Sequence, residues 1–212
     1  MAQSPDFALV LAIVETSERC TRELDSIINF PTHYERRWQA IWIQFAYAMF
    51  FGHMALRMAY RKFGARGRET VAQVLCPMLI RTAVLSFESP EGALAEFRPV
   101  LQDIAEEWEF EYSRCAGFVF EQAPQKEITG NSILAALARN VLELSGYKVP
   151  VTDEQTGSWA LADFVAAGKT RCRYTSDPLP LNPFNILLVQ RLAITGIESL
   201  ALPDHIETIM SQ

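Results

Sequence analysis

The stretch WQAIWIQFAYAMFFGHMAL, residues 38–56, decides the fold, because it runs nineteen residues without a charged side chain. Basic residues flank it on both sides, Arg36 and Arg37 before it and Arg57 and Arg61 after it. A helix of this length spans about 28 Å at about 1.5 Å per residue, which suits either the hydrocarbon layer of a membrane or the middle of a helical domain. In both interpretations this segment lies at the centre of the molecule.

The surrounding sequence favours the interior of a domain over a membrane span. Basic residues at both ends of the segment give no clear orientation under the positive-inside rule. The rest of the chain supplies amphipathic helices that can cover a helix that is apolar on every side. We therefore expect Trp42, Phe45, Met49 and Leu56 to be buried in protein, with membrane contact through residues 38–56 as the alternative.

Composition is that of one globular domain. The chain has 212 residues, of which 50% are hydrophobic and 21% charged, so it can bury a sizeable core. The sequence predicts a single all-α domain over residues 1–212, and a boundary near residue 147 would mark a smaller C-terminal subdomain, 147–212. A net charge of −6 is the wrong sign for binding nucleic acid through its phosphates.

Local start and stop signals predict six to eight helices packed around a hydrophobic central helix at about 32–63. Most of the expected helices begin at a capping residue or a proline, and most end at a glycine or a proline. These helices cover about 5–29, 32–63, 68–87 with Pro77 inside it, 90–116, 132–145 capped by Asn131 and ended by Gly146, 158–167, 183–200 capped by Asn182, and a tail after Pro203. A kink or a split is expected at Pro77.

One segment is ambiguous between helix and strand. In EEWEFEY, residues 106–112, acidic and aromatic residues alternate as in a strand, but the longer apolar pattern around it has a helical period. We expect a helix. Trp108 and Tyr112 then face the core, while Phe110 projects elsewhere.

The aromatic residues of this helix form the first candidate site. Trp108, Phe110 and Tyr112, with Glu107 and Glu111 beside them, have the composition of a partner-binding strip with aromatic anchors and a polar rim. The carboxylates offer two other interpretations, a paired acid–base site or a solvated helix face.

The second candidate site is a pocket for a flat apolar ligand along the central helix. His53 lies inside the apolar run and supplies a donor for such a ligand, with Trp42, Phe45, Phe50 and Met54 as the lining. The alternative is a neutral core histidine that hydrogen-bonds to the backbone or to Gln44.

The third candidate is an anion site in the proline-rich segment 169–183, where Arg171 and Arg173 could receive a negative charge. Gly168-Lys169-Thr170 resembles the end of a phosphate loop, but position 163 is Asp where that motif requires glycine. A solvated loop is the alternative.

Signatures of catalysis and of metal binding are missing from the sequence. There are three histidines and four widely spaced cysteines, and no nucleophile stands in a recognisable setting. No catalytic residue, metal or cofactor is predicted. The N-terminal segment lacks a basic region and a cleavage site, and reduced cysteines are typical of the cytoplasm.

These observations predict a cytoplasmic, non-catalytic helical protein that binds another protein or self-associates, as an adaptor, a chaperone-like partner or an inhibitor. Two alternatives remain at this point. One is a helical pocket for an apolar small molecule or cofactor, and the other is an enzyme without a recognisable sequence signature.

Overall fold

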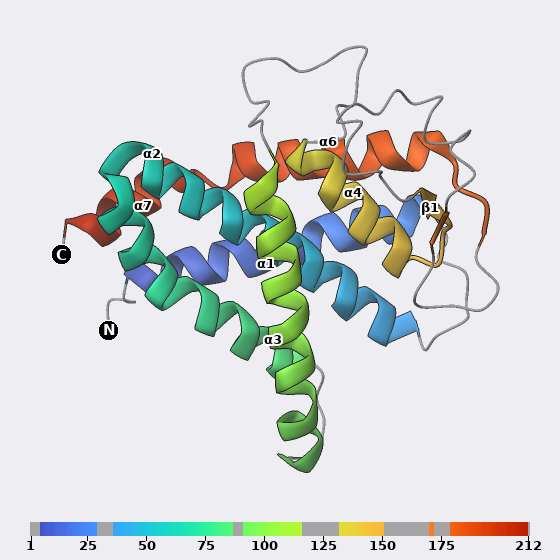
Figure 1. The fold of residues 1–212 in the computed structure, drawn as a ribbon, viewed down its shortest axis with the longest axis horizontal. Coiled ribbons are helices and arrows are strands. Elements are labelled where there is room, and N and C mark those ends of the chain that lie inside the picture. Colours follow the sequence, from blue (N-terminus) through green and yellow to red (C-terminus); the bar gives the residue numbers. More distant parts are fainter. Residues whose placement is uncertain are drawn as a thin grey trace.

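The computed structural model describes residues 5–28, 36–86, 91–115, 132–150, 170–171 and 179–211. Within these ranges the fold is all-α, as predicted, with six helices and one short two-stranded ladder (Figure 1). The helices are α1 (Pro5–Ile28), α2 (Arg36–Ser86), α3 (Glu91–Arg114), α4 (Ile133–Leu144), α6 (Pro183–Ser199) and α7 (Leu202–Met210). The antiparallel ladder pairs β1 (Val149–Pro150) with β2 (Thr170–Arg171).

Helix α2 is the centre of the bundle, because it packs against α1, α3, α4 and α7. Phe45, Met49 and Leu56 are buried, as predicted, while Trp42 is half-buried. The uncharged run 38–56 of α2 is thus covered by amphipathic helices on several sides, which is the arrangement expected for a helical segment with no polar face.

Helix α2 consists of two arms that meet at Gly64. We call residues 36–63 the first arm and 65–86 the second arm. Gly64 has φ 69° and ψ −161°, and these are the non-helical angles within α2. The second arm folds back against the first, with Leu75 and Leu79 beside Gly52, and runs toward α3 (Figure 1). The predicted stop at Gly64 is confirmed as a break, whereas a split at Pro77 is wrong because the second arm continues through that residue.

Substitution Gly64→Ala is expected to destabilise the fold by about 1 to 3 kcal/mol, because this backbone conformation is accessible almost only to glycine. An added Cβ would meet no atom within 4 Å, so backbone strain is the whole cause. Chemical denaturation measures the loss. D-Alanine introduced at Gly64 by semisynthesis is the control, since it favours these angles, and equal stability of the L-Ala variant would contradict the prediction.

The helix ends follow the local signals closely, with one correction. Ser132, and not the expected Asn131, caps α4 by accepting a hydrogen bond from the Leu134 backbone N–H at 3.2 Å. Gly146 follows α4 with φ 86°, as a C-terminal glycine should. Asn182 caps α6 as predicted, accepting from the Phe184 N–H at 3.0 Å.

Several expectations fall outside the described residues or stay untested. The expected start of the central helix at 32–35 and the helix at 158–167 lie outside them.

The two C-terminal helices pack against the N-terminal part of the bundle: α6 contacts α1 and α4, and α7 contacts α1 and α2. A subdomain boundary near residue 147 stays a prediction.

Candidate functional site: a groove between α2 and α3

A groove with a volume of about 540 Å³ lies between the second arm of α2 and helix α3. This volume is in the range of pockets that hold ligands or protruding side chains, about 300 to 1,000 Å³. Its apolar lining consists of Met49, Cys76, Pro77, Ile80, Ala105 and Phe110. Its polar lining consists of Arg68, Gln102, Glu106, Glu109 and Ser113. Because Met49 belongs to the first arm, three helical segments meet at the groove.

Phe110 lines this groove and is 63% exposed, although it is an aromatic residue. Its helix neighbours Trp108 and Tyr112 are 2% and 0% exposed, so the predicted division of the three rings between two surfaces is confirmed. The guanidinium of Arg114 lies over the Phe110 ring, 5.6 Å from its centroid. The residues 106–112 are helical, as the longer pattern indicated.

A polar network lies beneath the groove and is centred on Glu109. One carboxylate oxygen, Oε2, is 2.7 Å from His53 Nδ1 on the first arm of α2. The other, Oε1, is 3.4 Å from Arg68 Nη2 on the second arm. One side chain of α3 therefore contacts both arms of α2, on either side of the break at Gly64.

The hydrogen bonds of His53 define its tautomer. Arg57 Nε donates to His53 Nε2 at 2.8 Å, so Nε2 is the acceptor and the neutral ring carries its proton on Nδ1, which donates to Glu109. The expectation of a backbone or Gln44 partner is wrong, because Glu109 and Arg57 are the partners. Both ring nitrogens of His53 are therefore hydrogen-bonded within the protein.

Arg57 also closes the C-terminal end of α3. Its Nη2 donates to the backbone carbonyls of Tyr112 and Cys115, both at 2.8 Å. The last carbonyls of a helix have no partner within the helix, and a cation there also interacts favourably with the helix dipole. Arg57 thereby fixes the end of the helix that carries the groove.

Glu111 lies on the opposite side of α3 and contacts the buried helix α4. Its carboxylate accepts hydrogen bonds from Arg139 Nη2 and, at 3.2 Å, from Asn140 Nδ2. Arg139 and Asn140 are both buried. Glu111 is therefore part of the α3–α4 contact, while Glu107 is exposed on α3.

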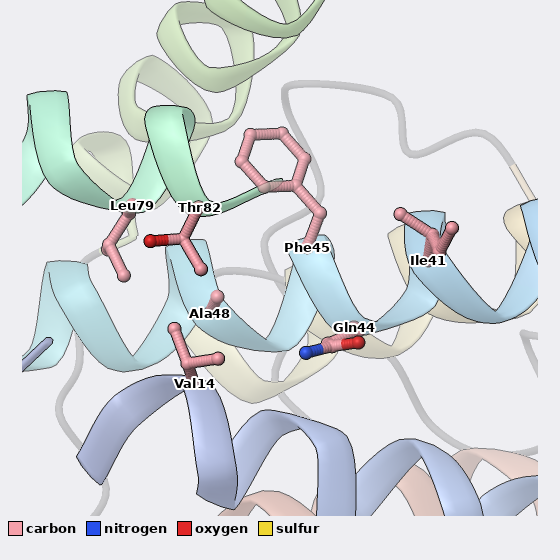
Figure 2. Close-up of a pocket in the computed structure, with 7 residues that line it drawn as sticks. All are labelled: Val14, Ile41, Gln44, Phe45, Ala48, Leu79 and Thr82. Carbon is pink, nitrogen blue, oxygen red and sulfur yellow. The ribbon is translucent and has the colours of Figure 1, made fainter. Parts of the chain in front are cut away.

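The residues predicted to line an apolar pocket are placed mainly in the core. Phe50, His53 and Met54 are buried, and the Phe45 ring packs 5.7 Å from the Trp108 ring and 6.4 Å from the Trp42 ring. Phe45 also borders a small void of about 20 Å³, shown in Figure 2 with its lining of Val14, Ile41, Gln44, Phe45, Ala48, Leu79 and Thr82. That void has room for about one water molecule.

The predicted anion site is only partly described. Arg171 lies in strand β2, where its backbone pairs with Val149, and its side chain lies outside the description. Arg173 lies outside the described residues altogether. An anion site there stays a prediction.

The described cysteines are free thiols that resist ionisation. Burial raises the pKa of Cys20 to about 12. Burial, and then the Glu109 carboxylate, raise the pKa of Cys76 in the groove. A thiol with a raised pKa is a poor nucleophile at neutral pH, since the thiolate is the reactive form.

Within the described ranges, no group of three or more His, Cys, Asp or Glu residues is placed to hold a metal ion. Over the same ranges, no single helix has the length and apolar character to cross a membrane. The helices Phe184–Ser199 and Leu202–Met210 are bent by 46° relative to each other. Only when they are taken together do they have the length and the apolar composition that a membrane span requires.

Comparison with known proteins gives no family for this chain. No protein-family model, curated protein or solved structure matches it.

Sequence reasoning missed the second-arm wall of the groove, which consists of Arg68, Cys76, Pro77 and Ile80. The apolar face predicted for this segment consists of Val71, Val74, Leu75, Met78, Leu79 and Thr82. Val71, Leu75 and Leu79 are buried, and the other three are half-buried. Ile80 and Cys76 lie beside that face as a further apolar pair four residues apart. That pair is the one local signal of a second contact surface on this helix.

Proposed function

We propose that this protein binds another protein, through the groove between α2 and α3 and through the exposed ring of Phe110. The observation that carries the proposal is the groove of about 540 Å³ with Phe110 at its edge. A large exposed aromatic residue beside a concave, partly apolar surface is typical of an interface anchor.

The shape of the groove supports a helical segment as the part that is bound. On α3 each lining residue lies three or four positions from another, so that together they form one helix face: Gln102, Ala105, Glu106, Glu109, Phe110 and Ser113. From Gln102 to Ser113 the axis of α3 rises about 16 Å, at about 1.5 Å per residue. Two or three turns of a partner helix would lie along such a length, as in other proteins that hold an amphipathic helix in a groove.

The alternative of an enzyme has less support in the described residues. His53 approaches the groove only through Glu109, and both of its ring nitrogens are hydrogen-bonded. Cys76 is the thiol in the groove lining, and burial raises its pKa. A catalytic nucleophile would need a lowered pKa or a free base beside it.

A cytoplasmic location belongs to the same proposal. Cys20, Cys76 and Cys115 are free thiols, two of them buried in the helical core. Reduced cysteines are usual in cytoplasmic proteins, whereas proteins of oxidising compartments more often have disulfides.

The proposal predicts that Phe110→Ala weakens partner binding by about 2 kcal/mol, which is roughly thirtyfold, and leaves the melting temperature almost unchanged. The ring is 63% exposed, so its removal takes little apolar surface out of the core. The measurement is quantitative mass spectrometry of proteins retained from the native host by the wild-type and variant proteins, together with thermal melts.

Phe184→Ala is the matched control, because Phe184 is 76% exposed and lies on α6, away from the groove. A stoichiometric partner retained by the wild type and by Phe184→Ala, and lost by Phe110→Ala, would support the proposal. An identical set of retained proteins for all three would overturn it, as would a large drop in the melting temperature of Phe110→Ala.

A further inference from the structure

We infer that the helix bound in this groove is basic and amphipathic, with apolar side chains directed at the floor and a Lys or Arg directed at Glu106. This inference rests on the proposed function and names the chemistry of the partner. It follows from the charges that line the groove: some are paired with an opposite charge, and one carboxylate is not.

Among the described residues, the charged ones in the groove lining are Arg68, Glu106 and Glu109. Glu109 is engaged on both oxygens, by His53 at 2.7 Å and by Arg68 at 3.4 Å. Glu106 is exposed, and its carboxylate accepts a bond from the neutral amide of Gln102 at 3.2 Å. The groove lining therefore has a surplus negative charge at Glu106, on a protein whose net charge is −6.

Phe110 strengthens the preference for a cation at this point. It lies four residues after Glu106 on α3, so the two side chains are neighbours on one face of the helix. The guanidinium of Arg114 already lies over one face of the Phe110 ring, 5.6 Å from its centroid, so a Lys or Arg of the partner would meet the Glu106 carboxylate and the other face or the edge of the ring. Carboxylates and aromatic faces both attract cations.

The floor of the groove supplies the apolar half of the recognition. Met49 is buried, and Ile80 and Cys76 are half-buried at the other wall. Leucine-like side chains spaced three or four residues apart on a partner helix would cover these atoms, with basic residues alongside them at the rim. An acidic helix of the same apolar pattern would place like charges against Glu106 and be repelled.

The experiment uses two synthetic helical peptides with the same leucine pattern, one with lysine and one with glutamate at every polar position. Fluorescence anisotropy gives their Kd values for the full chain. The lysine peptide is expected to bind at least about tenfold more tightly than the glutamate peptide. It should also protect Cys76 from alkylation at alkaline pH, where the thiolate forms, because that thiol lines the groove. Peptide mass spectrometry reads the alkylation.

Two variants with the same change of charge distinguish the local effect of a groove carboxylate from the effect of the net charge of the protein. Glu106→Lys is expected to raise the Kd of the lysine peptide by about tenfold. Glu198→Lys should leave Kd within about twofold. Glu198 is exposed on α6 and does not line the groove. Thermal melts of both variants verify that they are folded.

Equal weakening by the two variants, equal binding of the two peptides, or no binding of the lysine peptide would each overturn the inference. Failure of the proposed function is read separately, from the retention of host proteins by Phe110→Ala. If Phe110→Ala loses a native partner while the lysine peptide does not bind, the groove remains a protein-binding site and only the basic character of its partner is wrong.

Discussion

Phe45→Asp is expected to abolish folding. Phe45 is 2% exposed and its ring packs against Trp108 from α3, so an aspartate there would be enclosed by apolar side chains. A buried unpaired carboxylate costs several kcal/mol, which is comparable with the whole stability of a domain of this size. Loss of the cooperative thermal transition, followed by circular dichroism, is the measurement.

Tyr60→Asp is the control for this substitution. Tyr60 lies on the first arm of α2 as well, but it is 57% exposed, so a carboxylate at that position stays in water. We expect Tyr60→Asp to melt cooperatively, close to the wild-type temperature. If the Phe45→Asp protein also melted cooperatively, α2 would not be the centre of the core.

Glu111→Ala is the second substitution with a large expected effect, a loss of about 3 kcal/mol in the free energy of unfolding. It removes the carboxylate that accepts hydrogen bonds from Arg139 and Asn140, and it leaves the Arg139 guanidinium buried. Removing one partner of a buried ion pair costs about 3 to 5 kcal/mol. The Glu111 side chain is 27% exposed and Arg139 makes a further contact, so we expect the lower end of that range. Urea denaturation provides the measurement.

The double variant Glu111→Leu with Arg139→Met tests the cause. Replacing both members of a buried ion pair by apolar residues of similar volume is often neutral or stabilising, so this protein should regain part of the lost stability. The part not regained is the hydrogen bond that buried Asn140 donates to Glu111. Glu106→Ala is the control for removing a carboxylate from α3, because Glu106 is exposed and should change stability little. A double variant as unstable as Glu111→Ala would show that the ion pair is not the cause.

Most of the helices could be predicted from the sequence because their signals are local. Pro5, Gly64, Gly146 and Asn182 each mark a helix end through backbone chemistry that acts within a few residues. The all-α class follows from the same kind of signal, since apolar residues recur at intervals of three or four along the amphipathic helices that cover the uncharged run 38–56.

The candidate site could be predicted only in part, because the groove depends on contacts between distant residues. His53 and Glu109 are 56 residues apart, and Arg68 and Glu109 are 41 residues apart. No periodicity within one helix indicates which residue of another helix will face it. Phe110 could be identified from sequence because its exposure follows from the helical period of α3 alone. Arg68 and Ile80 line the groove because the break at Gly64 places the second arm of α2 beside α3, and the sequence does not indicate that placement.

The contact of Glu109 with both arms of α2 has a consequence for genetics. His53 lies on one arm and Arg68 on the other, so the Glu109 carboxylate connects the two arms. The position of the groove wall that contains Arg68 therefore depends on the angle between the arms. A change in that angle moves Arg68 and Ile80 relative to α3. A genetic screen for loss of binding should therefore recover substitutions at Gly64 and His53, neither of which lines the groove, together with substitutions at Phe110 and Glu106 that meet the partner directly.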